Sequence, residues 1–342
     1  MMLIGGEGTR LRPLTYYTPK PMVPVLNRPF LEHVFAYLKH YGVDDIILTL
    51  NYLPQAVQDY FGDGSKLGVK LTYVVEDSPL GTAGAIKNVE KHLDSTFVVL
   101  NGDIFTDLDI ADMLACHRRT RARASIALNW VDNPCAFGVV ETGTDNRVGN
   151  FVEKPSPDRI TSHWINAGIY ILEPEVLQYA PAGTHYMFER GLFPQLIEMN
   201  EPVYGYPFRG YWLDMGTPAK YLGLNCDLLL SKVKTPLVSL GKDGICCERD
   251  AAIHPSARIV GPAVIGRGSR IERGAQIKGP VVVGPDCVVG EGASLDRVVL
   301  WPRVKVGAGA SVVHCIVGSD IKDNSQVADR VVTPDHHGSI AQ

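Results

Sequence analysis

The sequence predicts an α/β domain with a mostly parallel, mixed sheet and flanking helices, followed by a parallel β-helix. Three observations support this prediction. β-rich segments alternate with helical patterns over residues 1–230, as in sheets whose strands are joined by helices. A six-residue hydrophobic repeat follows over residues 251–330, a period that neither an α-helix nor a simple strand produces. The chain has 342 residues, which suits two domains better than one.

Local patterns place the elements of the first domain. The segment 29–42 is amphipathic, begins with a proline and ends with a glycine, so it predicts a helix. Short apolar segments predict strands, the first of them at Met2–Ile4. The other expected strands are residues 45–50, 69–75, 97–100, 124–131, 137–141, 150–154 and 166–172. Three other helices are expected: one that begins at Pro54, one over residues 82–93 and one over residues 217–233.

Branched aliphatic residues recur at six-residue spacing in the second domain. They are Ile253, Ile259, Ile265, Ile271, Ile277, Val283, Val289 and Leu295, and most are followed four positions later by a small residue. In a hexapeptide β-helix, each side of a triangular coil places one such residue inside and a small residue where the chain bends. The register is lost after Trp301 and resumes, shifted, at Ile321 and Val327. We expect residues 231–250 to link the domains and residues 331–342 to form a tail.

Composition excludes several classes of function. The net charge is −4, so no overall positive field would recruit nucleic acid or an anionic membrane. No apolar run approaches the ~20 residues of a membrane span. The seven cysteines are scattered and form no C-x-x-C pair, so neither a disulfide framework nor a zinc site is expected. Because the segment MMLIGGEG also lacks the features of a signal peptide, we expect a soluble, cytoplasmic protein.

The segment GGEGTRLRPLTYYTPKPM, residues 5–22, combines three glycines with basic side chains. Phosphate-binding loops use glycines because backbone N–H groups must approach the phosphate, with cations close by. Two familiar phosphate loops do not fit. The sequence lacks the pattern G-x-x-x-x-G-K-[ST] here, and Leu11 stands where a dinucleotide fingerprint needs its third glycine. The segment therefore predicts another kind of phosphate loop, with Arg10 and Lys20 as its cations.

Seven segments, in order, resemble the signature of the sugar-nucleotide pyrophosphorylases, nucleotidyltransferases that join a nucleoside triphosphate to a sugar 1-phosphate. They are LIGGEGTRLRPLTYYTPKPMVPVLNRP (3–29), EDSPLGTAGAI (76–86), VVLNGDIFTDLD (98–109), FGVVE (137–141), FVEKP (151–155), NAGIYIL (166–172) and YWLDMGTPAKYL (211–222). Several of them look most like mannose-1-phosphate guanylyltransferases with a hexapeptide tail. The resemblance implies a Rossmann-like sheet, a left-handed β-helix, and synthesis of GDP-mannose and pyrophosphate from GTP and mannose 1-phosphate.

The chemistry of this reaction asks for positive charge rather than for a base. An oxygen of the sugar phosphate attacks the α-phosphorus of the triphosphate, and pyrophosphate leaves. The nucleophile is already an anion, so cations, metal and positioning do the work. The catalytic residues that the resemblance implies are Arg10, Lys20, Asp103 and Asp214, the first two on the triphosphate. The nucleotide-binding positions that it implies are Leu3, Gly5, Gly6, Gly8, Thr9, Arg10, Lys20, Glu76, Gly81, Thr82 and Asp103.

Two aspartates are the expected metal ligands. Magnesium prefers oxygen ligands, typically one or two carboxylates with phosphates and waters. Asp103 follows the apolar segment 97–101 and is expected at the carboxyl edge of the sheet, where ligands bind in this architecture. The resemblance makes Asp214 the second metal-facing carboxylate, so Mg²⁺ is the expected cofactor. Asp109 is a candidate helix N-cap, and we expect Asp107 to be structural.

The resemblance assigns the sugar phosphate to Gly138, Glu153, Lys154 and Asn166. A compact ammonium suits a phosphate, and the carboxylate of Glu153 can accept hydrogen bonds from sugar hydroxyls. Adjacent strand residues point to opposite faces, so Glu153 and Lys154 reach one ligand only if the strand ends or bulges there. The alternative is an ordinary salt bridge between these two side chains at a sheet edge.

Glu76 bears on the choice of base. Relatives that use thymidine triphosphate tend to carry a glutamine at this position, and an amide suits the single N–H donor of thymine. Guanine offers two neighbouring donors, N1–H and N2–H₂, which an ionised carboxylate accepts together. Glu76 therefore favours GTP, unless it is an exposed glutamate at a strand end. No residue can be named that reads the C2 hydroxyl by which mannose differs from glucose.

Other interpretations stay open. A glucose-1-phosphate thymidylyltransferase or another NDP-sugar synthase would perform the same type of reaction. A non-catalytic regulatory subunit would keep the fold, although the intact Arg10, Lys20, Asp103 and Asp214 count against it. Hexapeptide coils also occur in acyltransferases, but the histidines of this coil show no partner pattern. Because the open end and flat faces of a coil favour packing against another subunit, we expect a homo-oligomer formed through the β-helix.

Overall fold

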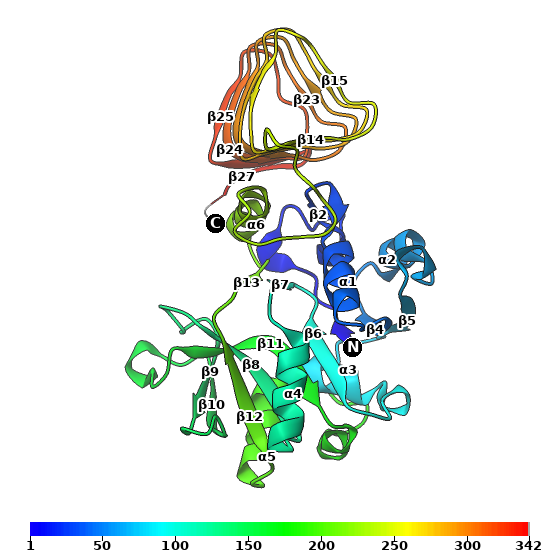
Figure 1. Ribbon diagram of the computed structural model, residues 1–342, viewed down its shortest axis with the longest axis vertical. Coiled ribbons are helices and arrows are strands. Elements are labelled where there is room, and N and C mark those ends of the chain that lie inside the picture. The colour runs from blue at the N-terminus through cyan, green and yellow to red at the C-terminus, as the bar shows by residue number, and fades with distance from the viewer. Residues whose placement is uncertain (341–342) are drawn as a thin grey trace. The chain divides into compact units, whose positions relative to one another are not determined.

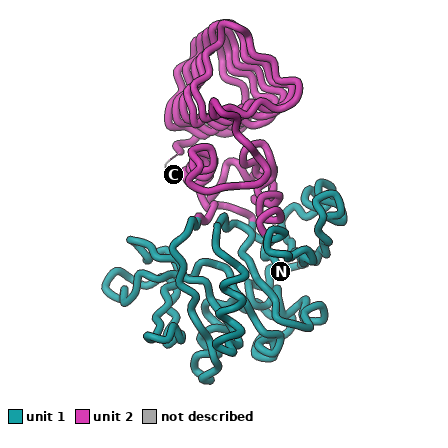
Figure 2. The backbone as a smooth tube through the Cα atoms, viewed as in Figure 1, with its two compact units in different colours: residues 1–6, 38–212 teal, residues 7–37, 213–342 magenta. Residues whose placement is uncertain are grey.

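The computed structural model describes residues 1–340, and the chain forms two compact units. The first unit contains residues 1–6 and 38–212, and the second contains residues 7–37 together with the chain from Leu213 onward (Figure 2). The units are therefore not successive stretches of sequence. The glycine-rich loop is divided between them, because Gly5 and Gly6 belong to the first unit and Gly8, Arg10 and Lys20 to the second.

A mixed nine-stranded sheet forms the centre of the first unit (Figure 1). Its main path is β10-β9-β11-β6-β1-β4-β5, and β8 pairs with β11 and β12. The pairs β6-β1, β1-β4, β4-β5 and β8-β12 are parallel, whereas β11 is antiparallel to β6 and β8. The strands are β1 (Met2–Leu3), β4 (Asp45–Leu50), β5 (Lys70–Val75), β6 (Phe97–Asn101), β8 (Ala124–Trp130), β9 (Gly138–Thr142), β10 (Val148–Glu153), β11 (Trp164–Leu172) and β12 (Val203–Phe208).

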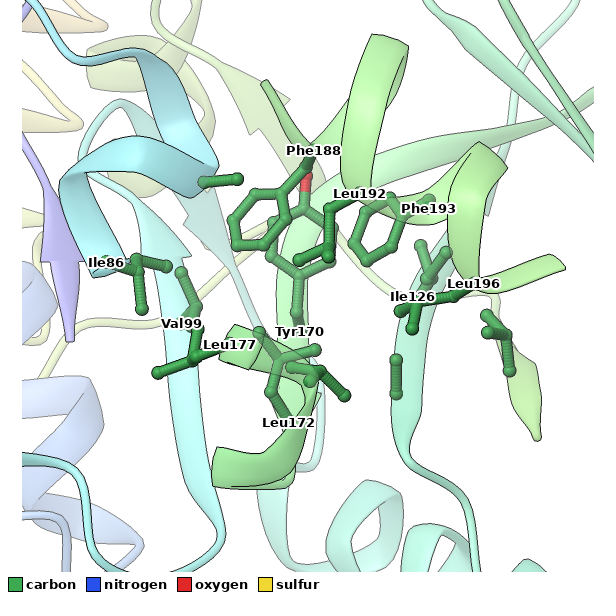
Figure 3. Close-up of a cluster of buried hydrophobic side chains, with 14 of the residues drawn as sticks. Ile86, Val99, Ile126, Tyr170, Leu172, Leu177, Phe188, Leu192, Phe193 and Leu196 are labelled. Atoms are coloured by element: carbon green, nitrogen blue, oxygen red, sulfur yellow. The ribbon is translucent and has the colours of Figure 1, made fainter. Parts of the chain in front are cut away.

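Helices pack against this sheet around an aromatic core. The helices of the first unit are α2 (Pro54–Phe61), α3 (Gly81–Lys87), α4 (Ile110–Thr120) and α5 (Phe193–Glu198), and α1 (Phe30–His40) crosses from one unit to the other. α4 contacts β8, β11 and β12, and α5 contacts β10 and β12. The rings of Tyr170, Phe188 and Phe193 lie 4.9–5.1 Å apart between centroids (Figure 3). Each buried ring contributes about 1.5–3 kcal/mol through loss of apolar surface.

The second unit begins with the rest of the glycine-rich loop and a tight hairpin. Strands β2 (Pro24–Val25) and β3 (Arg28–Pro29) are antiparallel. Leu26 and Asn27 connect them with φ angles of 45° and 66°, and two-residue hairpin turns of this kind require positive φ at both positions. Helix α6 (Pro218–Leu229) contacts β2 and the coil strands β20, β22 and β24.

The remainder of the second unit is a coil of parallel strands, which confirms the predicted β-helix. Aligned residues are 18 apart in the first turns, as in Ala252, Arg270 and Val288. Later turns are shorter, from Ser294 to Ser311 and from Ser311 to Gln326, which are 17 and 15 residues. Turns of 18 residues preserve a six-residue period and shorter turns do not, which explains the shift of the pattern after Trp301. The coil strands are β14 (Ile245–Cys247), β15 (Ala252–Ile253), β16 (Arg258–Val260), β17 (Ala263–Ile265), β18 (Arg270–Ile271), β19 (Gln276–Lys278), β20 (Val281–Val283), β21 (Val288–Val289), β22 (Ser294–Leu300), β23 (Lys305–Val306), β24 (Ser311–Val317), β25 (Gln326–Ala328) and β26 (Arg330–Thr333). A last strand, β27 (His336–Ser339), is antiparallel to β26.

The structure differs from the sequence-based predictions at several places. β14 lies within the predicted linker and pairs with β17, and the hairpin β26-β27 extends into the predicted tail, whose last residues, 341–342, lie outside the described part. Ile253 is 39% exposed because its strand pairs on one side only. The helix expected at 82–93 ends at Lys87, before a 3-10 turn at Glu90–His92. No helix among residues 1–340 combines the length and apolar character that crossing a membrane requires.

Candidate active site

The glycine-rich loop begins at an edge of the first sheet. β1 lies between β4 and β6 and is parallel to both. Leu3 ends β1 and is followed by Gly5 and Gly6, and Asp103 follows the end of β6. Because parallel strands present their carboxyl ends at the same edge, these four residues lie at one edge of the sheet. The expected location of Asp103 is thereby confirmed.

The contact between β1 and β6 at this edge depends on a glycine. A Cβ atom at Gly102 would lie 1.8 Å from Cγ2 of Ile4, so no larger residue fits without moving the backbone. Asn101 lies directly before this glycine, and its Oδ1 atom is buried without a hydrogen-bond partner among the described residues. A buried polar atom in this state costs free energy unless a ligand satisfies it. The sequence did not identify Asn101 as a site residue.

The second part of the loop, in the second unit, folds back so that Gly8 lies against Lys20. Gly8 has a φ angle of 63°, which glycine adopts readily, and it precedes the 3-10 turn Thr9–Leu11. The Thr15 hydroxyl donates a 2.8 Å hydrogen bond to the carbonyl oxygen of Gly8. A Cβ atom at Gly8 would lie 3.3 Å from Cβ of Lys20. Arg10 and Lys20 therefore belong to one closed loop, with the Arg10 side chain 67% exposed.

Asp214 lies in a cluster of charged side chains in the second unit. It ends β13 (Trp212–Asp214) and is 7% exposed. Its Oδ2 atom lies 3.1 Å from Nζ of Lys220 and 3.9 Å from Nη2 of Arg10. Thr217 caps α6 by accepting a 3.4 Å hydrogen bond from the backbone N–H of Lys220, so the start of this helix fixes the lysine beside the carboxylate.

The other oxygen of Asp214 has the properties of a cation ligand. Oδ1 is buried and has no hydrogen-bond partner among the described residues. A Cβ atom at Gly216 would lie 2.5 Å from this oxygen, so glycine leaves the space beside it open. Within residues 1–340 no three or more His, Cys, Asp or Glu side chains form a metal-binding group. Magnesium does not require one, because phosphates and waters supply most of its ligands.

Glu76 is buried where β5 ends, so the alternative of an exposed glutamate is wrong. The residue is 8% exposed. Its Oε2 atom accepts a 3.2 Å hydrogen bond from the backbone N–H of Leu80, and Asn51 donates a 3.0 Å bond to its carbonyl oxygen. Burial raises the pKa of Glu76, and the bond from Leu80 opposes this in part. A buried carboxylate held in this way can distinguish ligands by the donors they present.

Thr82 lies in the first turn of α3, next to a residue that the sequence did not single out. Gly81 opens the helix with a φ angle of 72°. The Thr82 hydroxyl donates a 3.1 Å hydrogen bond to Oε2 of Glu189 and accepts a 2.8 Å bond from the backbone N–H of Phe188. Both partners belong to the π-helical turn Phe188–Leu192. Such turns are rare and frequently mark functional sites.

Gly138, Glu153 and Lys154 come together at the end of strand β10. Gly138 and Glu153 are paired residues of β9 and β10, and a Cβ atom at Gly138 would lie 2.9 Å from Oε2 of Glu153. The strand ends at Glu153, and Lys154 has a φ angle of 50°. Lys154 Nζ lies 3.8 Å from Oε1 of Glu153. The side chains of Glu153 and Lys154 therefore do not point to opposite faces of the sheet, as adjacent strand residues would. This is the condition for both to reach one ligand, as expected from the sequence.

Asn166 lies just before an irregularity in β11. The pairing of β11 with β8 shifts its register between Asn166 and Tyr170, and Gly168 within this stretch has a φ angle of 71°. Nδ2 of Asn166 donates a 2.8 Å hydrogen bond to the Tyr170 hydroxyl, and Oδ1 accepts a 2.9 Å bond from the N–H of Gly168. The bulge thus fixes both ends of the Asn166 amide, and the ring of Tyr170 anchors it in the core (Figure 3).

The model of the nucleotidyl transferase family matches residues 1–231 of this chain. The chain belongs to this family. A second family model, described as the GMPPB C-terminal domain, matches residues 247–336, which span the coil. The expected enzyme class, a nucleotidyltransferase, is thereby confirmed, and this family generally uses a divalent metal.

Several individual proteins that this chain resembles are named as sugar-1-phosphate nucleotidyltransferases. A mannose-1-phosphate guanylyltransferase of Mycobacterium tuberculosis is 37% identical, covering 91% of this chain and 82% of the relative. A UTP–glucose-1-phosphate uridylyltransferase of Synechocystis sp. is 32% identical, covering 99% and 94%. Among solved structures, HddC from Yersinia pseudotuberculosis complexed with GMP-PN is 32% identical, with a TM-score of 0.57, covering 66% of this chain and 96% of the other.

Two aspartates of this nucleotidyl transferase have the structural roles that the sequence predicted. Asp109 caps α4, since its Oδ1 atom accepts a 2.9 Å hydrogen bond from the N–H of Asp112. Asp107 accepts a 2.6 Å hydrogen bond from the N–H of Tyr211. Lys220 and Glu189, by contrast, were missed. Lys220 lies six residues after Asp214, near the start of α6, and this spacing could have identified it. No local pattern identifies Glu189.

Proposed function

We propose that this nucleotidyl transferase is a mannose-1-phosphate guanylyltransferase, which makes GDP-mannose and pyrophosphate from GTP and mannose 1-phosphate. The environment of Asp214 carries the proposal. Two cationic side chains lie beside its Oδ2 atom, and its Oδ1 atom is buried without a partner among the described residues. This arrangement suits a reaction between two polyanions that share a bound cation.

The proposed reaction needs no proton transfer. A phosphate oxygen of mannose 1-phosphate attacks the α-phosphorus of GTP and forms a new P–O bond. The bond from the α-phosphorus to the oxygen that bridges to the β-phosphate breaks, and its electron pair leaves with pyrophosphate. Arg10 and Lys20 bind the triphosphate, with Arg10 on the leaving group, because positive charge there stabilises the developing negative charge.

We propose Mg²⁺ as the divalent metal, with Asp103 and Asp214 as its protein ligands. The buried, unpartnered Oδ1 of Asp214 and the space that Gly216 leaves beside it support this choice. When bound, the ion would neutralise phosphate charge and hold the triphosphate in a reactive geometry. Asp103 follows strand β6, whose end pairs with β1, so its backbone is positioned before any ligand arrives.

The choice of guanine rests on Glu76 and on the loop that precedes α3. A carboxylate in this buried place can accept hydrogen bonds from both N1–H and N2–H₂ of guanine. The other nucleotide contacts that we propose come from the first part of the chain and from α3: Leu3, Gly5, Gly6, Gly8, Thr9, Gly81 and Thr82. Several of these are glycines whose backbone N–H groups can approach phosphate or sugar oxygens.

The sugar phosphate is assigned to the cluster at the end of β10. Lys154 binds the phosphate, Glu153 accepts hydrogen bonds from hydroxyls, and Asn166 and the backbone of Gly138 complete the contacts. Support comes from the left-handed conformation of Lys154, which places it beside Glu153, and from the bulge that orients Asn166. We place this reaction in the cytoplasm, where nucleoside triphosphates are supplied.

We also propose that the protein forms a homo-oligomer through its coil. The first turn consists of β14, β15 and β16, each of which pairs on one side only among the described strands. Val260 on this turn is 65% exposed. Unpaired strand edges and exposed aliphatic residues favour association. Light scattering should give a mass above that of one chain, and Val260→Lys should lower it; a monomeric wild-type protein would exclude this role.

A pyrophosphate-release assay tests the function. With Mg²⁺ present, we expect GTP with mannose 1-phosphate to give the fastest turnover, ahead of GTP with glucose 1-phosphate. Faster turnover with dTTP or UTP and glucose 1-phosphate would assign the protein to another NDP-sugar synthase. No release with any pair would favour the regulatory-subunit alternative. Chelation of divalent ions should abolish the activity.

A further inference from the structure

Side chains from the C-terminal part of the second unit hold the hairpin that follows the Lys20 loop. The Tyr221 hydroxyl donates a 2.5 Å hydrogen bond to the carbonyl oxygen of Pro24, and Oδ1 of Asn225 accepts a 2.9 Å bond from the N–H of Leu26. Nδ2 of Asn27 donates a 3.0 Å bond to the carbonyl oxygen of Val283 in the coil. We call these three hydrogen bonds the hairpin clamp.

A fourth hydrogen bond comes from within the N-terminal segment. Nε2 of His33 lies 2.9 Å from the carbonyl oxygen of Val25, and Nδ1 lies 2.8 Å from the hydroxyl of Thr235. His33 is 2% exposed. Because the carbonyl can only accept, Nε2 carries the proton and Nδ1 accepts from Thr235. Each of the four consecutive residues 24–27 is thus held by a side-chain hydrogen bond.

The backbone of the turn is strained, so these hydrogen bonds are needed to stabilise its conformation. Leu26 has a φ angle of 45° and is 2% exposed. A leucine in the left-handed region is unfavourable and persists only where surrounding contacts require it. The hydrogen bond from its N–H ends on Asn225, which is fully buried at 0% exposure. Without that acceptor, the hydrogen bond that stabilises the strained conformation of Leu26 would be lost.

The chain between this turn and Lys20 is stiff. Pro21 and Pro24 fix two of its backbone φ angles, and Pro19 fixes the φ angle directly before Lys20. Val23, fully buried, donates a 3.2 Å hydrogen bond to the carbonyl oxygen of Lys20 and accepts a 3.0 Å bond from the N–H of Phe30. A displacement of the hairpin is therefore transmitted to Lys20 instead of being absorbed by a flexible linker.

Two hydrogen-bonded links between the coil and this hairpin occur among the described residues. One is the hydrogen bond from Asn27 to Val283 of β20. The other passes through Tyr221, whose hydroxyl accepts a 3.1 Å hydrogen bond from Nε1 of Trp301 while it donates to Pro24. Tyr221 is completely buried, so its hydroxyl has a fixed orientation between the coil and the hairpin.

We propose that Tyr221, Asn225 and Asn27 are positioning residues that make the C-terminal coil part of the triphosphate site, by fixing through the hairpin clamp where Lys20 lies. The coil then has a role within one chain in addition to any role in assembly. This inference rests on the proposed function, since it takes Lys20 to bind the triphosphate. It predicts that loosening the clamp weakens the triphosphate side of the reaction and leaves the sugar side unchanged.

Two variants test the clamp without touching a proposed substrate contact. Tyr221→Phe removes the hydroxyl that joins Trp301 to Pro24. Asn27→Gly removes the bond to Val283 and keeps a residue that adopts positive φ readily. Each removes one hydrogen bond that ends on residues 24–27, and each should raise the KM for the nucleoside triphosphate about fivefold, with the KM for the sugar phosphate within about twofold. Ser269→Ala is the matched control, because it deletes a buried hydroxyl that bridges Gly284 and Cys287 within the coil.

The outcomes separate this inference from the proposed function. An unchanged triphosphate KM in both variants, or an equal rise in Ser269→Ala, would overturn the inference while the wild-type protein remained active. If Tyr221→Phe fails to fold, Asn27→Gly decides, since Asn27 is half-buried whereas Tyr221 is fully buried. A wild-type protein without turnover would contradict the proposed function. Calorimetric affinities of wild type and variants for Mg–GTP would then test the clamp directly, with a weaker affinity in the variants as the supporting result.

Discussion

The hydroxyl of Thr82 donates a hydrogen bond of 3.1 Å to Oε2 of Glu189, across 107 residues of sequence. Glu189 also interacts with the hydroxyl of Tyr170, which accepts a hydrogen bond from Asn166. One largely buried carboxyl group therefore links a proposed nucleotide contact to a proposed sugar contact. Burial raises the pKa of Glu189 and nearby Glu153 raises it further, whereas the bond from Thr82 lowers it.

Glu189→Ala should weaken the binding of both substrates. Loss of the shared carboxyl removes one hydrogen bond from each of the hydroxyls of Thr82 and Tyr170, and each lost hydrogen bond corresponds to about a fivefold rise in KM. Glu189→Gln keeps an acceptor oxygen and should stay within about twofold of the wild type. Steady-state kinetics with each substrate varied in turn provide the measurement. Glu173→Gln, in a separate, partly buried hydrogen-bond network with His117, is the control and should change neither KM.

The pH dependence of stability gives Glu189 a second readout. A carboxyl whose folded pKa is raised above its unfolded value of 4.5 contributes stability that is complete below that value and is lost as pH rises through the folded pKa. Glu189→Gln does not ionise, so its melting temperature should gain on that of the wild type as pH increases from about 4.5. A constant difference across this range would show that Glu189 keeps an ordinary pKa.

Asp214→Asn should reduce turnover strongly while the protein stays folded. The amide has nearly the same shape but carries no charge, so the pair with Lys220 and the proposed metal ligand are both lost. We expect kcat to fall on the order of a hundredfold and the Mg²⁺ concentration for half-maximal activity to rise. Asp109→Asn is the control, because asparagine caps helices as well as aspartate. Equal activity of Asp214→Asn and wild type at limiting Mg²⁺ would contradict the assignment.

Acid should destabilise the second unit through His33. Burial lowers the pKa of His33 from 6.5 to about 4. The charge of Arg28 lowers this pKa slightly further, whereas the hydrogen bond to Val25 raises it in part. The unfolded chain therefore binds a proton at higher pH than the folded one, and stability is lost as pH falls from 6.5 towards 4. The full effect amounts to about 3 kcal/mol. Chemical denaturation between pH 4.5 and 7.5 should show it, and His33→Gln, which can still donate to Val25, should flatten the curve.

Local patterns predicted those parts of the fold that depend on local chemistry. The strand that carries Glu76 at its end and the helix capped by Asp109 follow from short segments whose own residues decide their conformation. The coil was predictable while its turns kept 18 residues, as at Val288, and became unreadable when the turn between Ser294 and Ser311 shortened to 17. A periodic pattern carries no information about a turn that breaks its period.

Long-range relationships in the site were not predictable in the same way. The partnership of Thr82 with Glu189 joins segments that share no spacing rule, and the orphaned Oδ1 of Asp214 exists only because of what surrounds it. The resemblance to a family identified Asp214 as a candidate metal ligand, whereas its neighbours became known only from the structure. The packing of the segment 7–37 with the C-terminal part of the chain likewise depends on buried side chains such as Asn225, which reads in the sequence as an ordinary helix residue.

The selectivity for guanine should depend on Glu76 and on pH together. Glu76→Gln replaces an acceptor of two hydrogen bonds by an amide that matches thymine or uracil, so the ratio of kcat/KM for GTP to that for dTTP should fall about tenfold or more, the equivalent of ~1.4 kcal/mol. Asp77→Asn, at the exposed neighbouring position, should leave the ratio unchanged. Because burial raises the pKa of Glu76, the wild-type carboxylate becomes protonated at a higher pH than an ordinary glutamate. The KM for GTP should therefore rise as pH falls in the wild type and remain flatter in Glu76→Gln, and identical pH profiles would remove Glu76 from base recognition.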